Sequence, residues 1–254
     1  MKVKEISSPN NPTFKVFLRL NRARDIKKHG MALLSGPKQV REVLAEFPSR
    51  CAGVIFSDTH TPPDIAGTKG LRLYRVNPDL FRRLDLYDTG RPILIVHVEP
   101  FPILPDSAWP PGCTLCIPFQ DPANMGAVIR SAAAFGVPRI VIMREAAHPF
   151  HPKSVRVAGS ALFRVPMFQG PSLESFRTSG VPMITLSPEG KDISHHGFPP
   201  VFCLVPGLEG PGLPDHLRNE TVLSIPMKPG VESLNAALAT GIVLFLWYSG
   251  LKGK

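Results

Sequence analysis

Residues 119–136, FQDPANMGAVIRSAAAFG, run from the end of an apolar strand through a turn into a helix. Asp121-Pro122 marks the turn, Asn124 is a candidate N-cap, and Gly136 ends the helix. The same order of strand, loop and helix recurs through the second half of the chain. Strands that alternate with helices are typical of a mostly parallel sheet covered on both faces, so the sequence predicts an α/β fold.

Five strands and four helices are expected in this second half. The strands are Thr114–Phe119, Arg139–Met143, Pro182–Leu186, Val201–Val205 and Thr221–Ile225, and the helices are Met125–Phe135, Ser172–Thr178, Pro214–Asn219 and Ser233–Tyr248. Ligands of such sheets bind in the loops beyond the carboxyl ends of the strands. This rule directs attention to three loops, at residues 119–136, 205–213 and 225–235.

The first half is predicted to be a separate, smaller α/β sandwich at residues 1–98. Five prolines between Val98 and Gly112 interrupt regular structure, so residues 99–112 are interpreted as a linker and residues 113–254 as a second domain. The elements expected in the first domain are helices at Thr13–His29, Pro37–Phe47 and Pro78–Leu84 and strands at 31–36, Ala52–Phe56, Leu71–Val76 and Ile93–Val98.

Charge is distributed unevenly along the chain. Of the 254 residues, 29 are Lys or Arg and 20 are Asp or Glu, for a net charge of +9, and residues 1–41 hold ten basic and two acidic side chains. Lys15, Arg19 and Arg22 lie at spacings of four and three on one side of the first predicted helix. Such a concentration of positive charge favours a polyanionic partner, nucleic acid before an acidic membrane surface, although a solubilising charged face is the alternative.

Composition excludes several classes of protein. With 43% hydrophobic and 19% charged residues, the chain can bury a core and is not disordered overall. Four scattered cysteines do not make a disulfide scaffold, and the N-terminus has no signal-peptide pattern, so a reducing cytoplasm is expected. The longest apolar run, Ala236–Tyr248, is too short to cross a bilayer. Secreted, membrane-spanning and fibrous proteins are therefore excluded.

The three loops carry the candidate chemistry. Arg130 lies among small apolar residues in the first helix, which suits an arginine that pairs with a carboxylate or faces an anionic ligand. The second loop, VPGLEGPGL, has three glycines, but it lacks the Lys-Ser/Thr of a P-loop, and Glu209 would repel a phosphate. A nucleoside with a positive centre fits it better, and an ordinary glycine turn is the alternative. In the third loop Ser233 or Asn235 could cap the last helix, whose all-round apolar character indicates burial that includes a subunit interface.

Taken together, NMGAVIRSAAAFG, PGLEGPGL and IPMKPGVESLNAALA resemble the three ordered motifs of the SpoU/TrmH-type RNA ribose methyltransferases, in the SPOUT superfamily. The similarity covers about residues 113–250, and it is specific because all three motifs occur in order. The N-terminal stretch SSPNNPTFKVFLRLNRARDIKKHGMALLSG resembles, more loosely, the ribosomal-protein-like RNA-binding domain that precedes this catalytic domain in many relatives.

The resemblance implies a specific activity: transfer of a methyl group from S-adenosylmethionine to a ribose 2′-hydroxyl, usually in ribosomal or transfer RNA. The additional N-terminal domain favours ribosomal RNA over transfer RNA, because structured loops need an added binding surface. It also implies a C-terminal trefoil knot and a homodimer formed through the catalytic domain. The polar catalytic cluster would consist of Asn124, Arg130, Glu209 and Asn235. The cofactor pocket would be lined by Leu186, Gly207, Ile225, Ser233 and Leu234.

The side chains themselves suggest how such a cluster works. A guanidinium stays protonated at neutral pH, so Arg130 is expected to bind a phosphate and stabilise a developing alkoxide rather than act as the base. No metal site is predicted, because Cys113 and Cys116 lack a second pair of ligands and the histidines lie in proline-rich loops. The alternative to an enzyme is an RNA-binding protein that keeps the fold without catalysis.

Overall fold

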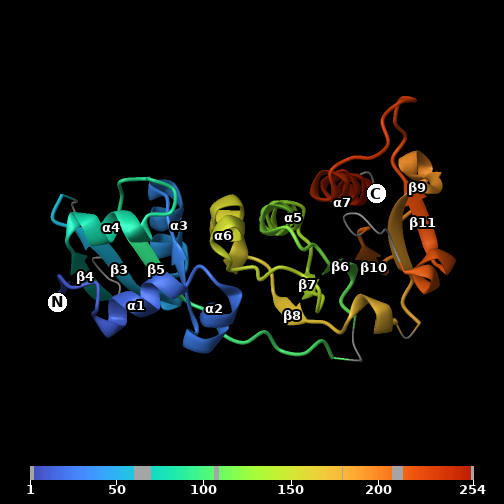
Figure 1. The fold of residues 1–254 in the computed structure, drawn as a ribbon. Helices are drawn as coiled ribbons and strands as arrows, with labels where there is room; N and C mark the ends of the chain where they lie inside the picture. Colours follow the sequence, from blue (N-terminus) through green and yellow to red (C-terminus); the bar gives the residue numbers. More distant parts are fainter. Residues whose placement is uncertain (1–2, 60–69, 106–108, 179, 208–213, 253–254) are drawn as a thin grey trace. The chain divides into compact units, whose positions relative to one another are not determined.

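The computed structural model describes residues 3–59, 70–105, 109–178, 180–207 and 214–252 (Figure 1). Its contacts divide the chain into two compact units. The first unit comprises Met1–Pro100 together with His148–Phe163, and the second comprises Phe101–Ala147 together with Arg164–Lys254. Residues 148–163 were predicted to belong to the second domain, whereas in the structure their contacts group them with the first unit.

A mixed five-stranded sheet forms the first unit, in the order β1-β4-β3-β5-β2. The strands β1, β4 and β3 are parallel, while β5 runs antiparallel to β3 and β2. The strands are β1 (Val3–Ile6), β2 (Met31–Leu34), β3 (Cys51–Ser57), β4 (Arg72–Val76) and β5 (Ile93–His97). The helices are α1 (Pro12–Arg19), α2 (Ala23–His29), α3 (Pro37–Glu46), α4 (Pro78–Leu84) and α6 (Pro152–Ala158).

Both faces of this sheet are buried. On one face Ile55 and Ile93 belong to a core cluster that also contains Phe14 and Phe17 of α1 and Phe81 of α4. Neighbouring residues of a strand point to opposite faces, and the next residues along β3 and β5 are equally buried. These are Val54, Leu94 and Val96, all without exposed surface.

The predicted helix over Thr13–His29 is wrong as one element, because it is two helices. The chain leaves the helix after Arg19, and Arg22 has an extended backbone at φ −119° and ψ 131°. A continuous helix turns by about 100° per residue and would place Leu20 and Ile26 on different faces, whereas the break allows both to be fully buried. The predicted cap at Gly30 is confirmed, since Gly30 has the left-handed conformation at φ 60°.

Residues 148–163 are held to the rest of the first unit by polar and aromatic contacts. The Ser160 hydroxyl donates to the Glu42 carboxylate at 2.9 Å, and the rings of Phe163 and Phe47 lie 5.5 Å apart. The helix α6, which the sequence analysis did not predict, begins with Pro152 after His151. The His151 side chain accepts a hydrogen bond from Lys153 N and so serves as the N-cap.

The second unit contains a six-stranded sheet in the order β11-β9-β10-β6-β7-β8, and every strand pair in it is parallel. The predicted mostly parallel sheet is thereby confirmed. The strands are β6 (Gly112–Ile117), β7 (Arg139–Ile142), β8 (Met167–Gln169), β9 (Met183–Asp192), β10 (Val201–Val205) and β11 (Thr221–Ser224). The helices are α5 (Pro122–Ala134) and α7 (Ala236–Lys252).

α7 packs against α5 in this unit (Figure 1). Phe135, at the end of α5, lies 6.0 Å from Phe245 and 5.9 Å from Tyr248 between ring centroids. At Gly241 an added Cβ would lie 3.4 Å from Ser131 Oγ, so the two helices approach closely there. The side chains of Leu238 and Phe245 nevertheless remain 55% and 53% exposed, so α7 has an apolar face open to solvent.

Two predicted helices of this unit are short 3₁₀ turns instead, at Leu173–Ser175 and Asp215–Asn219. The first is held by Glu145, whose carboxylate accepts hydrogen bonds from Ser172 Oγ at 2.6 Å and from Leu173 N at 3.1 Å. The backbone is extended again at Phe176, so a longer helix cannot form. None of the described helices is long and apolar enough to cross a membrane.

Candidate functional site

The three predicted loops leave the same edge of the second sheet. They follow β6, β10 and β11, and these strands are parallel members of the contiguous order β11-β9-β10-β6. Parallel strands end at one edge, and ligands of α/β proteins bind beyond that carboxyl edge. The topology therefore brings together segments that lie more than a hundred residues apart in the chain.

The pairing between β9 and β11 is interrupted near the carboxyl edge. Thr185 pairs with Val222 of β11, but the next paired residues are Lys191 and Leu223, so residues 186–190 leave the ladder. The Ser224 hydroxyl donates to the Pro188 carbonyl at 3.1 Å and holds this excursion against the end of β11. The register break thus creates a bend in the middle of the edge where the loops emerge.

Gly207, two residues beyond β10, approaches this bend closely. A Cβ added at Gly207 would lie 2.9 Å from the carbonyl oxygen of Leu186, which is closer than real Cβ atoms come to another atom. Only glycine fits here without a shift of the backbone. Leu186 and Gly207 were both predicted to line a cofactor pocket, and the structure places them side by side.

A hydrogen bond between two amide side chains joins the first and third loops. Asn235 Nδ2 donates to Asn124 Oδ1 at 2.9 Å, across 111 residues of sequence. Asn235 also caps α7, since its Oδ1 accepts from Leu238 N at 3.1 Å. A single side chain therefore fixes the start of α7 and ties it to α5.

The predicted N-cap role of Asn124 is wrong. Asp121 caps α5 by accepting from Ala123 N at 2.9 Å, and Pro122 occupies the first helical position. Proline is favoured there because its missing N–H is not needed in the first turn. The shift places Asn124 inside the first turn, and its amide is used for the bond to Asn235.

The remaining predicted site residues differ in their exposure. Arg130 is exposed on α5, Ser233 is exposed in the third loop, and Ile225 and Leu234 are half-buried. Glu209 lies outside the described residues, so its place in the catalytic cluster stays a prediction. The structure thus brings the three loops to one edge, with amides, a hydroxyl and a guanidinium as their polar groups.

Thr185 is a candidate that the sequence analysis missed. Its side chain has no exposed surface, and its Oγ1 has no hydrogen-bond partner among the described residues. A buried hydroxyl without a partner costs free energy, so such a group calls for an explanation. Thr185 lies on β9 immediately before the chain leaves the ladder, and a threonine at the end of an apolar strand was the signal available in the sequence.

The cysteines belong to the core rather than to a reactive site. Cys116 and Cys203, on neighbouring strands, are fully buried with their sulfur atoms 3.2 Å apart, and both are free thiols. Burial raises the pKa of the Cys113 and Cys203 thiols well above the ordinary value. These thiols are therefore protonated at neutral pH and are poor nucleophiles.

The three cations predicted to bind RNA lie in the first unit. Lys15 and Arg19 are exposed on α1, and Arg22 is exposed at the start of α2. Within the described parts of the chain, none of the three takes part in an ion pair, whereas Arg50 pairs with Glu99 at 2.9 Å. Their charges are thus not neutralised by neighbouring acids, as a phosphate-binding surface requires.

Comparisons with known proteins match this chain to RNA methyltransferases. The model of the SpoU rRNA methylase family matches residues 115–245. The chain is 44% identical over 245 residues to a protein of Syntrophobacter fumaroxidans named ribosomal RNA small subunit methyltransferase G 2. This match covers 96% of this chain and 49% of that protein. The chain thus spans only about half the length of this relative.

Two other proteins match over nearly their whole length. The 23S rRNA (guanosine(2553)-2'-O)-methyltransferase RlmP of Bacillus subtilis is 28% identical over 250 residues, covering 96% of this chain and 98% of that protein. The crystal structure of an AdoMet-bound rRNA methyltransferase from Sinorhizobium meliloti superposes with a TM-score of 0.81 at 25% identity, covering 98% of both chains. Both matches extend over the two units described above.

Proposed function

This chain belongs to the SpoU rRNA methylase family, and from that premise we propose that it methylates a ribose 2′-hydroxyl of RNA with S-adenosylmethionine as the methyl donor. The observation that carries the proposal is the Asn235–Asn124 hydrogen bond at the carboxyl edge of the parallel sheet. It joins two of the three motif loops at the edge where ligands of α/β proteins bind. Ribosomal RNA is the favoured substrate, because the relative that matches over 98% of its length is named as a 23S rRNA 2'-O-methyltransferase.

The residues at this edge fit the proposed cofactor. Gly207 approaches the Leu186 carbonyl closely and has no side chain, so the backbone of the loop is available to a ligand. The Thr185 hydroxyl, which has no hydrogen-bond partner among the described residues, would be a polar partner for the cofactor. Leu186, Ile225 and Leu234 are half-buried and can cover the apolar parts of a nucleoside. When bound, the cofactor supplies an activated methyl group on a sulfonium, and these residues would hold and orient it.

Arg130 would act on the RNA. Its guanidinium remains protonated at neutral pH, so it is a poor base but a strong ligand for a phosphate and for an alkoxide that develops at the 2′-oxygen. Asn124 ties the first turn of α5 to Asn235 at the start of α7, so the helix that carries Arg130 has a fixed orientation at this edge. Glu209 would orient the guanidinium from the glycine-rich loop.

The first unit would bind the RNA through phosphates. Lys15, Arg19 and Arg22 are exposed and lie in the most basic part of the sequence. Each phosphate contact releases counterions, so the affinity should fall steeply with salt. The resemblance of this unit to a ribosomal-protein-like RNA-binding domain supports the same role.

Two further features of the family are part of the proposal. A trefoil knot would pass through the loops around Gly207 and Ile225, where β9 leaves and rejoins the ladder. A homodimer would form through the apolar face of α7, since Leu238 and Phe245 are large, exposed and on one helix. A dimer of this kind is tested by sedimentation of the wild type against Phe245→Glu.

The proposal is tested by incubating the purified chain with S-adenosylmethionine carrying a labelled methyl group and with ribosomal RNA that lacks natural modification. We expect incorporation of label at a ribose 2′-oxygen, mapped by the resistance of that position to alkaline cleavage. Calorimetry measures cofactor binding in parallel. Binding of RNA without cofactor binding or methyl transfer would instead identify a catalytically silent RNA-binding protein.

A further inference from the structure

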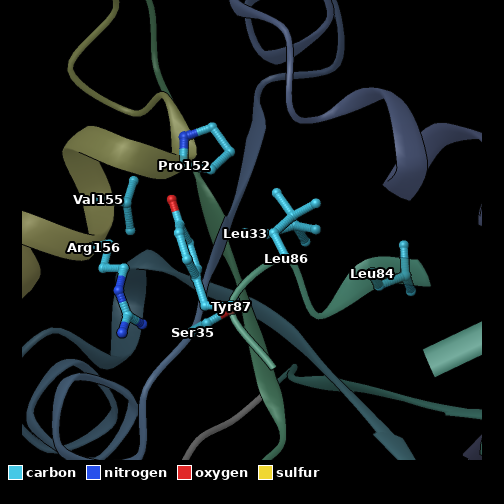
Figure 2. Close-up of a pocket in the computed structure, with 8 residues that line it drawn as sticks. All are labelled: Leu33, Ser35, Leu84, Leu86, Tyr87, Pro152, Val155 and Arg156. Carbon is cyan, nitrogen blue, oxygen red and sulfur yellow. The ribbon is translucent and has the colours of Figure 1, made fainter. Parts of the chain in front are cut away.

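The first unit has a small hollow on its surface, and none of its lining residues belongs to α1 or α2. It lies where β2, the turn after α4 and helix α6 meet (Figure 2). Its lining is mostly apolar, with a tyrosine and an arginine at one side. The lining residues are Leu33, Ser35, Leu84, Leu86, Tyr87, Pro152, Val155 and Arg156.

Arg156 and Tyr87 form a stacked pair in this lining. The guanidinium carbon of Arg156 lies 4.4 Å from the centre of the Tyr87 ring. Arg156 is exposed on α6, while Tyr87 is half-buried, and burial raises the pKa of its phenol, so the ring is uncharged at neutral pH. Figure 2 shows Tyr87 standing between Arg156 on one side and Leu86 on the other.

Hydrogen bonds within the turn fix the backbone that carries Leu86 and Tyr87. The buried Asp85 carboxylate accepts hydrogen bonds from Thr89 Oγ1 at 3.1 Å and from Gly90 N at 2.8 Å. This closed turn keeps Leu86 pointing outward with 53% of its surface exposed. An apolar side chain is therefore presented to solvent by a fixed backbone, next to a stacked cation.

We propose that Leu86, Tyr87 and Arg156 bind an unpaired RNA base. This inference rests on the proposed function, because it names a second contact of the same substrate. A base has flat apolar faces that stack on aromatic rings and on guanidinium planes, and it carries a phosphate that attracts the exposed cation. The hollow is too small to enclose a base, and the Arg156 guanidinium already covers one face of the Tyr87 ring. The base would therefore lie across the mouth of the hollow, against Leu86, the edge of the Tyr87 ring and the exposed guanidinium of Arg156.

Charge around the hollow agrees with this orientation. Lys153 and Arg156 are both exposed on α6 and favour a phosphate on that side. Asp88 is exposed in the turn and disfavours one there. The base would therefore enter with its phosphate toward α6 and its face toward the turn.

The experiment compares two labelled RNAs by fluorescence anisotropy: a hairpin with an unpaired loop and a fully paired duplex of equal length. We expect Tyr87→Leu and Leu86→Ser to weaken hairpin binding by about five- to a hundredfold while duplex binding changes little, since stacking of one base has this strength. Tyr87→Phe keeps the ring and should bind as the wild type does. Leu86 is exposed, so Leu86→Ser tests the idea even if Tyr87→Leu does not fold.

The second unit offers a matched control. Arg139 lies over the ring of Phe168 at 4.9 Å, a similar cation–aromatic pair that is not part of the hollow. Phe168→Leu should leave hairpin affinity unchanged. Equal losses for Phe168→Leu and Tyr87→Leu would show a general loss of structure and would overturn the proposal.

The outcomes separate this inference from the proposed function. If the wild type methylates RNA but the Leu86 and Tyr87 variants bind the hairpin normally, the base site is refuted and the enzyme stands. If the wild type neither binds RNA nor transfers methyl groups, the proposed function itself fails. If Leu86→Ser changes only self-association, measured by sedimentation, the surface contacts a second copy of the chain and not a base.

Discussion

The carboxyl edge of the second sheet and the Tyr87–Arg156 surface of the first unit are built from different kinds of side chain. At the carboxyl edge the groups fixed by close contacts or burial are uncharged: an amide pair, a buried hydroxyl without a partner and a glycine that admits no side chain, with the exposed Arg130 as the charged group. At the Tyr87–Arg156 surface the distinctive groups are an aromatic ring, an exposed leucine and a cation. The first set suits a small polar ligand held in one orientation, and the second suits a flexible polyanion with flat bases.

The largest expected effect tests the chemistry assigned to the carboxyl edge. Arg130→Lys keeps the charge but loses the planar, two-pronged guanidinium. We expect methyl transfer to fall by roughly 100- to 1000-fold, as for the loss of a donor to a developing oxyanion, while the cofactor Kd stays the same. Single-turnover rates and calorimetry measure the two quantities.

A conservative exchange elsewhere provides the control. Arg177 is an exposed arginine of the same unit that bonds to backbone carbonyls outside the predicted site, so Arg177→Lys should be silent. Near-normal turnover of Arg130→Lys would show that the guanidinium geometry is unnecessary.

The next largest effect is the pH dependence of the stability of the first unit, which contains His148. Burial, with help from the charges of Lys27 and His151, lowers the pKa of His148 from 6.5 to about 4. The unfolded chain therefore binds this proton more tightly, so the first unit loses stability as the pH falls from about 6.5 toward 4, by roughly 3 kcal/mol at most. Denaturant unfolding at pH 7 and pH 5 measures the loss.

His148→Gln should flatten this pH dependence, because glutamine does not titrate. His151→Gln should flatten the pH dependence less, because burial also lowers the pKa of His151 but its side chain is only half-buried. An equally steep loss of stability in His148→Gln would assign the effect to other groups.

The amide pair gives a smaller effect, on stability and geometry. Asn124→Ala removes the bond between the loops, while Asn235→Ala removes both that bond and the cap of α7. We expect about 1 kcal/mol for the first and about 2 kcal/mol for the second, because an N-cap contributes about 1 kcal/mol. A double-mutant cycle in denaturant isolates the shared bond, and additive losses would mean that the amides do not interact.

The smallest effect tests the orphaned hydroxyl. Thr185→Val preserves shape and removes a group without a partner, so the unfolding free energy should stay the same or rise while the cofactor Kd increases by about three- to tenfold. Thr114 is the internal control: it is equally buried and unpartnered, but it lies near the start of β6. Thr114→Val should leave the Kd unchanged, and equal shifts in both variants would remove Thr185 from the site.

Sequence patterns located the elements whose ends carry strong local signals. The helix Pro78–Leu84 and the strand Val201–Val205 have the predicted bounds, because proline starts the helix after the Asn77 cap and prolines flank the strand. The short strands β1 and β8, of four and three residues, were not predicted, because VKEI and MFQ carry little apolar pattern, unlike the similarly short edge strands β2 and β11. At such lengths tertiary pairing, and not local propensity, decides the structure.

The candidate site was predictable in its loops but not in its contacts. The Asn124–Asn235 bond spans 111 residues, and nothing local in either stretch specifies it. Asn124 was interpreted as a cap because the signal of Asp121-Pro122 was read only as a turn, although proline at the first helical position is itself a helix start. The position of Thr185 at the end of an apolar strand was visible in the sequence, but its burial without a hydrogen-bond partner required the structure.

The return of residues 148–163 to the first unit has a consequence for how the protein is made and dissected. During synthesis the first unit cannot complete its packing when Pro100 has left the ribosome, because α6, Ser160 and Phe163 are still to come. A fragment cut in the proline-rich segment would lack these partners, leaving Phe47 and Glu42 uncovered. Any attempt to express the two halves separately therefore has to carry residues 148–163 along with the first.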